Sequence, residues 1–325
     1  MTIPRRRFLQ LAGLLSAATA VPRIARSQAY PARPLRWIVG FPPGGAADIV
    51  VRLIGEALSG RLGQQVIVDN RPGAGTNIAA EAVVRAPADG YTLLLVGPAN
   101  AINATLYEKL PFNFLRDIAP VAGLNRSPMV MLVQPSSPFR TVAEFIAHAK
   151  SNPGKLSVAS GGNGTASQMA GGLFKMMAGV NFVDVPYRGE APALVDLRGG
   201  QVQAMFVTLT SGIEYARNGS LRALAVTTAT RAQALPDVPS VADFVPGYES
   251  STWNGVGTPR NTPAEIIARL NREINAVLAD AKIKARFAGL GATPLPISPA
   301  EFGNLVETET AKWMKVVKFL GLRPN

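Results

Sequence analysis

The chain has 325 residues, of which 47% are hydrophobic and 17% are charged, and its formal net charge is +12. This composition excludes an intrinsically disordered protein and provides enough apolar side chains for about two domains. Lysines and arginines are scattered after residue 29 and form no basic run, which argues against a nucleic-acid partner. Because the chain has no cysteine, disulfides and an acylated lipoprotein anchor in the membrane are excluded.

The first 29 residues have the pattern of a secretory signal peptide. Three arginines at 5–7 precede an apolar stretch over 8–21, and residues 27–29 (Ser-Gln-Ala) resemble a cleavage site. The apolar stretch is shorter than the roughly 20 residues that span a bilayer. An arginine pair followed by Phe-Leu is typical of twin-arginine signals, and general secretion is the alternative route. We predict a mature chain that begins at Tyr30 and diffuses freely in a Gram-negative periplasm.

Short apolar strands alternate with amphipathic helices along the mature chain. Residues 35–39 have a strand pattern, a glycine turn follows over 40–45, and apolar positions recur at three and four over 46–58, which indicates a helix. Residues 78–84 have a second helical pattern. The alternation predicts an α/β fold on a parallel or mixed sheet. Further strands are predicted at 65–68, 92–96, 129–133, 156–159, 183–185, 202–206 and 221–226.

Capping boxes mark three predicted helix starts. In this motif a hydroxyl side chain and a glutamate three residues later satisfy each other's backbone N–H groups. The three pairs are Thr141 with Glu144, Thr262 with Glu265, and Ser298 with Glu301.

The residue inventory argues against catalysis and metal binding. His148 is the sole histidine, and its place in the predicted helix after Thr141 is typical of a surface or boundary position. The chain has no G-x-S-x-G or S-x-x-K motif and no glycine-rich loop that ends in Gly-Lys-Ser/Thr. Zinc would need histidine or cysteine clusters that the chain lacks. We therefore predict that the protein is not an enzyme and uses no cofactor or metal.

Two glycine-rich loops each connect a predicted strand to a helix, over residues 41–48 and 160–167. At such a turn the first N–H groups of the helix are unpaired and partly positive, so a carboxylate or phosphate fits there. Glycine lets the backbone approach the ligand, although such turns also need glycine for structural reasons alone. Asp48 is equally suited to compensate the helix dipole and to contact a ligand. We predict that these loops are suited to capture a small anionic solute.

With these features, the mature chain resembles the periplasmic solute receptors of tripartite tricarboxylate transporters, also called Bug or TctC-type receptors, over almost its whole length. Seven motifs in family order carry the resemblance. They are Phe41-Pro-Pro-Gly-Gly-Ala-Ala-Asp48, Asn70-Arg-Pro-Gly-Ala-Gly-Thr-Asn77, Ala88-Asp-Gly-Tyr-Thr92, Val185-Pro-Tyr-Arg-Gly189, Asp196-Leu-Arg-Gly-Gly-Gln201, Ala234-Leu-Pro-Asp-Val-Pro239 and Ala311-Lys-Trp313.

The resemblance implies a two-lobed periplasmic-binding-protein fold of the type II clamshell class, with mixed sheets and strands that cross between the lobes. Lobe one would contain residues 30–128 and 250–325, and lobe two residues 129–249. The resemblance also implies a monomeric receptor that captures a carboxylate, such as a dicarboxylate or an aromatic carboxylate, in the cleft between the lobes. Its partner would be a permease with one large and one small integral membrane subunit.

The predicted ligand-binding residues combine the two loops with positions that the resemblance places at the cleft. The chain departs from the family pattern at Gln168, Gly172 and Val207-Thr208, where histidine, glutamate and Asp-Asn are common. A lost carboxylate in the cleft favours an amine-free ligand, with aromatic carboxylates included. The predicted set is Phe41, Gly44, Gly45, Asp48, Asn77, Asn100, Ser160, Gly161, Gly162, Gly164, Thr165, Ala166, Tyr187, Arg188 and Thr208.

Two alternatives stay open at this point. The same binding fold can serve a two-component sensor kinase instead of a transporter. A periplasmic hydrolase or isomerase on the same scaffold is disfavoured by the shortage of histidine and cysteine but is not excluded. Neighbouring genes for one large and one small membrane protein would favour transport, and an adjacent kinase gene would favour sensing.

Overall fold

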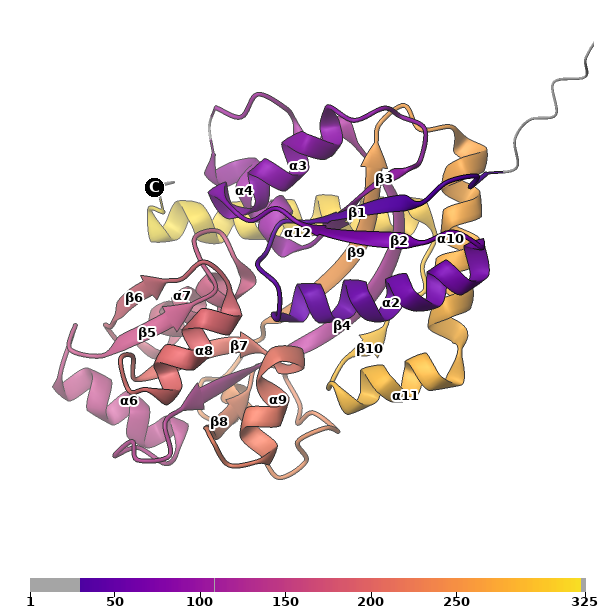
Figure 1. Ribbon diagram of the computed structural model, residues 1–325. Coiled ribbons are helices and arrows are strands. Elements are labelled where there is room, and N and C mark those ends of the chain that lie inside the picture. Colours follow the sequence, from indigo (N-terminus) through magenta and orange to yellow (C-terminus); the bar gives the residue numbers. More distant parts are fainter. Residues whose placement is uncertain (1–29, 108, 323–325) are drawn as a thin grey trace, which may run out of the picture. The chain divides into compact units, whose positions relative to one another are not determined.

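The computed structural model describes residues 30–107 and 109–322 (Figure 1). The predicted signal peptide over 1–29 therefore lies outside the described residues. From Arg33 onward the described residues form a single compact unit. No helix in these two ranges is long and apolar enough to cross a membrane.

In the described part of the chain, ten strands form one mixed sheet with the order β2-β1-β3-β9-β4-β7-β5-β6, and β8 and β10 pair with β4. Strands β1, β2 and β3 are parallel to one another, as are β7, β5 and β6, whereas β9 and β4 run antiparallel to their neighbours. The strands are β1 (Leu35–Val39), β2 (Val66–Asn70), β3 (Thr92–Val96), β4 (Ile118–Val133), β5 (Ser157–Ser160), β6 (Val183–Pro186), β7 (Ala204–Thr208), β8 (Arg222–Val226), β9 (Ser251–Pro259) and β10 (Thr293–Pro294).

Strand β4 changes its pairing partners along its length. From Ile118 to Pro128 it pairs with β9, and from Met129 to Val133 it pairs with β7 and β8. We call β2, β1, β3, β9 and the Ile118–Pro128 part of β4 the first half of the sheet, and Met129–Val133 with β7, β8, β5 and β6 the second half. The predicted division into two lobes stays a prediction.

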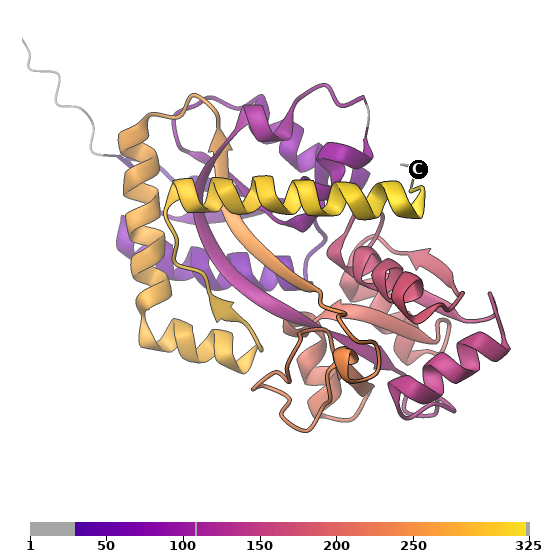
Figure 2. The same cartoon turned by 180° about the vertical axis from the view of Figure 1, so that it is seen from behind.

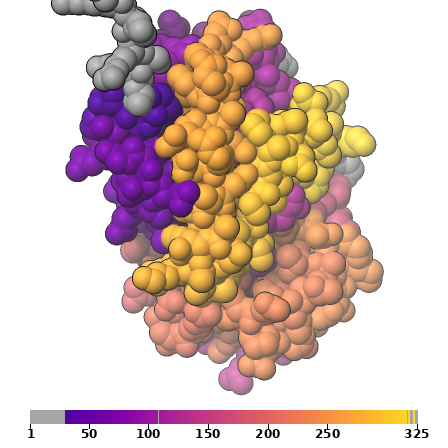
Figure 3. All heavy atoms as spheres, turned by 90° about the vertical axis from the view of Figure 1, so that its right-hand side faces the viewer, coloured from indigo at the N-terminus to yellow at the C-terminus, as the bar shows by residue number. Residues whose placement is uncertain are grey.

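Helices cover both halves of the sheet, because each strand-to-helix unit places its helix against the strands that flank it. Helix α12 lies across β9 and β4 in Figure 2, and Figure 3 shows α10 and α11 on the surface between α2 and α12. The helices are α2 (Ala46–Leu62), α3 (Asn77–Val84), α4 (Pro98–Leu106), α5 (Phe114–Asp117), α6 (Val142–Ser151), α7 (Ala166–Ala178), α8 (Glu190–Arg198), α9 (Leu209–Arg217), α10 (Ala264–Ala279), α11 (Ala281–Gly289) and α12 (Pro299–Leu320).

Each half of the sheet has its own apolar core. In the first half, Trp253 packs edge-on against Phe302, with ring centroids 5.8 Å apart. In the second half, the Phe174 ring lies 5.4 Å from Phe206 and 6.1 Å from Tyr248. Such aromatic pairs contribute beyond the area that they bury, so each half holds its strand ends, and the loops that follow them, in place.

The α/β alternation predicted from the sequence is confirmed, and so is the capping box of Ser298 and Glu301. At Thr141 only the hydroxyl half of the predicted box forms, because the Glu144 carboxylate accepts the Arg140 N–H instead of the Thr141 N–H. Thr141 and Ser298 accept hydrogen bonds from the N–H groups three residues later. The third prediction is wrong, because α10 begins at Ala264 and has Pro263 before it. The Thr262 hydroxyl instead donates to the Pro259 carbonyl at 2.8 Å, so it closes the turn that ends β9.

Candidate functional site

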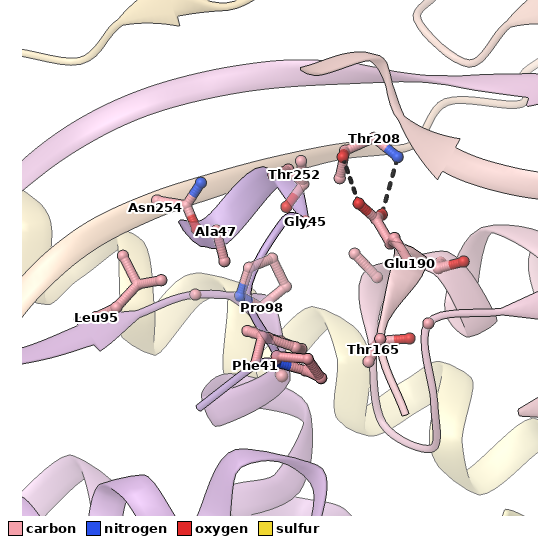
Figure 4. A pocket seen from close by; sticks show the side chains of 18 of the residues that line it. Phe41, Gly45, Ala47, Leu95, Pro98, Thr165, Glu190, Thr208, Thr252 and Asn254 are labelled. Carbon is pink, nitrogen blue, oxygen red and sulfur yellow. Dashed lines mark hydrogen bonds between the residues drawn. The ribbon is translucent and has the colours of Figure 1, made fainter. Parts of the chain in front are cut away.

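The first cavity lies where several strand-to-helix junctions meet, and its volume is about 710 Å³. Figure 4 shows its walls, which come from both halves of the sheet. Most of the lining side chains are small or apolar. The lining residues are Phe41, Pro42, Gly45, Ala46, Ala47, Leu95, Gly97, Pro98, Ala99, Gly161, Thr165, Ala166, Ser167, Gly189, Glu190, Ala191, Thr208, Thr252 and Asn254.

Five of the described helices begin at this cavity. The residues that immediately precede α2, α4, α7, α8 and α9 all line it, and they are Gly45, Gly97, Thr165, Gly189 and Thr208. The first N–H groups of a helix have no partner within the helix and together carry about half a positive charge. None of the lining residues is lysine, arginine or histidine. Any attraction of this cavity for an anion must therefore come from backbone dipoles and not from cationic side chains.

The first glycine loop is held from behind by Asp48. The carboxylate accepts the Gly44 N–H and the Asn70 side-chain amide, each at 3.0 Å, and pairs with Arg52 at 2.9 Å. Burial raises the pKa of Asp48, but these hydrogen bonds outweigh burial, so the pKa lies below its ordinary value. The carboxylate stays ionised and fixes the loop that carries Phe41 and Gly45 into the cavity.

The second glycine loop is held by Thr165 and Gln168. The Thr165 hydroxyl donates to the Gly162 carbonyl at 2.7 Å and accepts the Gln168 N–H at 3.3 Å. The Gln168 side chain accepts the Gly164 N–H at 2.9 Å and donates to Asp184 at 2.7 Å. The proton of the Thr165 hydroxyl is thus already used within the loop, which leaves backbone N–H groups of α7 as the donors that face the cavity.

Glu190 is a site residue that the sequence analysis missed. It is the first residue of α8, and it is the one charged side chain among the residues that line the first cavity. Its carboxylate accepts the Thr208 N–H at 3.0 Å and the Thr208 hydroxyl at 2.7 Å (Figure 4). Burial raises the pKa of Glu190, and hydrogen bonds from Thr208, Ser211 and the Ala46 backbone offset this only in part.

Two further lining residues that the sequence analysis missed belong to β9. Thr252 and Asn254 reach the cavity from the strand that pairs with β4, and the Asn254 amide donates to Asn125 at 3.1 Å. No local motif distinguishes them, because their role depends on a pairing between strands more than 100 residues apart. The one feature of the sequence that could have indicated Glu190 as a site residue is its position directly after the Val185–Gly189 motif.

A second cavity, of about 1250 Å³, opens beside the first. Tyr187 and Arg188 line it, together with the residues of the second glycine loop and with the 72–76 loop. The Tyr187 hydroxyl donates to Asp196 at 2.7 Å. Burial and this carboxylate raise the pKa of Tyr187 to about 12, so the phenol stays neutral.

The structure brings nine of the predicted ligand-binding residues to the walls of these two cavities. Phe41, Gly161 and Thr165 line both cavities. The first cavity also has Gly45, Ala166 and Thr208 on its walls, and the second also has Gly162, Tyr187 and Arg188.

The other predicted residues lie behind the walls: Gly44, Asp48, Asn77, Asn100, Ser160 and Gly164 line neither cavity. Asn100 serves the start of α4, since it accepts the Gly97 N–H at 3.0 Å and donates to Thr76 at 3.1 Å. Gly164 packs so tightly against Asn103 that an added Cβ would lie 2.2 Å from the Asn103 side chain. These residues shape the loops, and their contact with a ligand stays a prediction.

Two of the positions at which the chain differs from the family pattern also lie behind the cavity walls. Gln168 and Gly172 are absent from the lining of both cavities, whereas Glu190 supplies a carboxylate to the first. The premise that the cleft has lost a carboxylate is therefore wrong for these positions. Within residues 30–107 and 109–322, no three histidine, aspartate or glutamate side chains are placed to hold a metal ion.

Solved structures with this fold are periplasmic solute-binding proteins. The R. palustris protein Rpa4515 with adipate has a TM-score of 0.88 and 37% sequence identity, and the match covers 91% of this chain and 100% of that one. The periplasmic binding protein BugD has a TM-score of 0.87 at 32% identity over 90% and 99% of the two chains. MatC (Rpa3494) from Rhodopseudomonas palustris with bound malate has a TM-score of 0.84 at 31% identity over 89% and 100%. The predicted α/β clamshell fold class is confirmed.

Sequence relatives narrow this class to one family. The profile of the tripartite tricarboxylate transporter family receptor matches residues 50–322. The UPF0065 protein in the tcbD-tcbE intergenic region of Pseudomonas sp. strain P51 is 38% identical over 99% of this chain and 96% of its own length. BugT of Bordetella pertussis is 34% identical over 98% of both chains. The chain belongs to this family of solute-binding receptors, as the sequence motifs predicted.

Proposed function

We propose that the chain is a periplasmic receptor that binds a small carboxylate in the first cavity and delivers it to a tripartite tricarboxylate transporter. The signal sequence over 1–29 takes the chain across the inner membrane, and the paired arginines assign it to the twin-arginine route. The mature receptor acts as a monomer that starts at Tyr30. Its membrane partner is a permease with one large and one small subunit.

The observation that carries this proposal is the convergence of five helix N-termini on a cavity whose lining has no cationic side chain. Such N-termini bind carboxylates without the strong desolvation cost of a buried arginine. Binding through neutral donors is reversible, as a receptor that must release its cargo requires. Relatives with adipate and malate support a carboxylate as the ligand.

The predicted site residues on the cavity walls have distinct roles in this proposal. The N–H groups of Gly45 and Ala47 bind the carboxylate from the first half of the sheet, and Gly161 with Ala166 binds it from the second. Thr165 and Thr208 orient the helix starts that carry the donors. Phe41 covers the hydrocarbon part of the ligand.

The proposed domain division assigns these roles to two lobes. Residues 30–128 and 250–325 form lobe one, and residues 129–249 form lobe two. A ligand held by both glycine loops would tie the lobes together, and its release would let them separate.

A thermal-shift screen of carboxylates on the ligand-stripped mature chain, followed by calorimetry, tests the proposal. A ligand at about 100 times its dissociation constant should stabilise the chain by about 2.7 kcal/mol. Ala47→Phe should abolish binding, because Ala47 lines the cavity at the start of α2 and a phenyl ring would fill it. Ala285→Phe, at an exposed position of α11, is the matched control and should bind normally.

Binding that survives Ala47→Phe would place the ligand outside the first cavity, and a screen in which no carboxylate binds would overturn the proposal. Recovery of the bound ligand unchanged, measured by NMR after prolonged incubation, distinguishes a receptor from an enzyme.

A further inference from the structure

The carboxylate of Glu190 lies where a ligand carboxylate would be expected. It accepts both the N–H and the hydroxyl of Thr208 at the start of α9, and the Ala46 N–H at the start of α2 also favours its charged form. Figure 4 shows the Glu190 carboxylate turned toward Thr208. A side chain of this receptor therefore already uses donors from two of the five helix starts.

The charge balance of the cavity limits what else it can hold. The helix starts supply partial positive charge, roughly half an elementary charge each, and no cationic side chain adds to it. Glu190 already places a carboxyl group of its own at donors of these helix starts. The second carboxylate of a dicarboxylate ligand would compete with Glu190 for these donors, and repulsion between neighbouring carboxylates disfavours that arrangement.

The remaining walls indicate what the rest of the ligand looks like. Phe41, Pro42, Leu95 and Pro98 present apolar surface, and five alanines of the helix starts add methyl groups. Thr252 and Asn254 are the polar exceptions on β9. This lining suits a hydrocarbon or aromatic body with few polar groups.

We infer that the cavity selects a monocarboxylate, and that Glu190 is the specificity-determining residue because it occupies the place of the second carboxylate of a dicarboxylate. The inference rests on the proposed function of the first cavity. The end of the ligand next to Glu190 is then uncharged, and it is either apolar or a hydrogen-bond donor.

Calorimetry at pH 7 with two matched pairs of probes tests the inference: hexanoate with adipate, and benzoate with terephthalate. Each pair differs by one carboxylate. The wild-type chain should bind at least one monocarboxylate about tenfold or more tightly than its dicarboxylate partner, since a factor of ten corresponds to about 1.4 kcal/mol. Glu190→Ser removes charge and volume and should reduce that ratio at least tenfold. Glu190→Gln keeps the volume and should reduce it less.

Glu214→Gln is the matched control, because Glu214 is exposed on α9 and pairs with the exposed Arg217; it should leave the ratio unchanged. A native-like unfolding transition is required of each variant, and the wild-type ratio is informative without any variant.

A wild-type chain that binds either dicarboxylate as tightly as its monocarboxylate partner overturns the inference and leaves the proposed function intact. A ratio of monocarboxylate to dicarboxylate affinity that is unchanged in both Glu190 variants also overturns the inference and leaves the proposed function intact. Failure of all four probes also overturns the inference, and the wider carboxylate screen then decides separately whether the proposed function fails with it.

Discussion

The two glycine loops are held by the same hydrogen-bond pattern, but a carboxylate forms it in the first loop and an amide forms it in the second. In each, the N–H of a glycine is accepted by a side chain four residues later: Gly44 by Asp48 at 3.0 Å, and Gly164 by Gln168 at 2.9 Å. In each, that side chain also contacts the neighbouring parallel strand. Asp48 accepts from Asn70 at the end of β2, and Gln168 donates to Asp184 on β6. The common element is the hydrogen-bond pattern, not the residue.

The loops differ in charge and in how their helices are capped. The first loop depends on an ionised carboxylate next to Arg52, and its helix starts at Gly45 without a side-chain cap. The second depends on a neutral amide, and Thr165 caps its helix. The comparison teaches that the first loop should respond to pH and tolerate substitution at its helix start, whereas the second should depend on its backbone and its hydroxyl.

The largest expected difference concerns alanine at one glycine of each loop. Gly162 has φ of +121°, and an added Cβ would lie 2.7 Å from the Tyr187 carbonyl oxygen. Gly162→Ala should therefore lower the free energy of unfolding by about 2 to 4 kcal/mol. Gly45 has φ of −87°, and no atom lies within 4 Å of its added Cβ. Gly45→Ala should cost under about 1 kcal/mol.

Urea unfolding of the two ligand-free variants measures this difference. Equal losses of stability would mean that the second loop relaxes around the new side chain. Because Gly45 lines the first cavity, Gly45→Ala should still weaken ligand binding, which calorimetry checks.

A smaller effect is expected from the charge of Asp48. Its pKa lies below the ordinary value, so its contribution to stability is complete above the unfolded-state pKa of about 3.9 and is lost as the pH falls through the lower folded-state pKa. Asp48→Asn should therefore cost about 1 to 2 kcal/mol at pH 7 and progressively less on acidification. Unfolding free energies of both chains from pH 7 to pH 3 test this, and a difference independent of pH would contradict it.

The smallest expected effect concerns the helix caps. Thr165→Ala removes the acceptor for the Gln168 N–H and the donor to Gly162, and should cost about 1 kcal/mol. Gly45→Ser adds a hydroxyl at the uncapped start of α2 and should change stability by only a few tenths of a kcal/mol. Thermal unfolding of both variants sharpens the comparison; a Thr165→Ala chain as stable as wild type would show that the backbone alone holds the second loop.

Local sequence patterns were sufficient for most of the short strands and for the two loops, but they missed β9 and the Ile118–Pro128 part of β4. Strand β1, the glycine turn and α2 were predicted from periodicity and glycine placement, because hydrophobic spacing and φ preference act within a few residues. The wrong helix start at Thr262 shows the limit of this approach. Its hydroxyl had a choice of partners, and the end of β9 supplied a better one in Pro259.

The sequence by itself determined the α/β class, the receptor family and the loops that line the cavity, because these depend on short-range patterns and on motifs in a fixed order. Only the tertiary structure decided which loop residues face the cavity and which, like Asp48, brace it from behind. It also brought Glu190 and the β9 residues into the site. The physical reason is that strand pairing and burial join residues far apart in the chain, and no local pattern records such contacts.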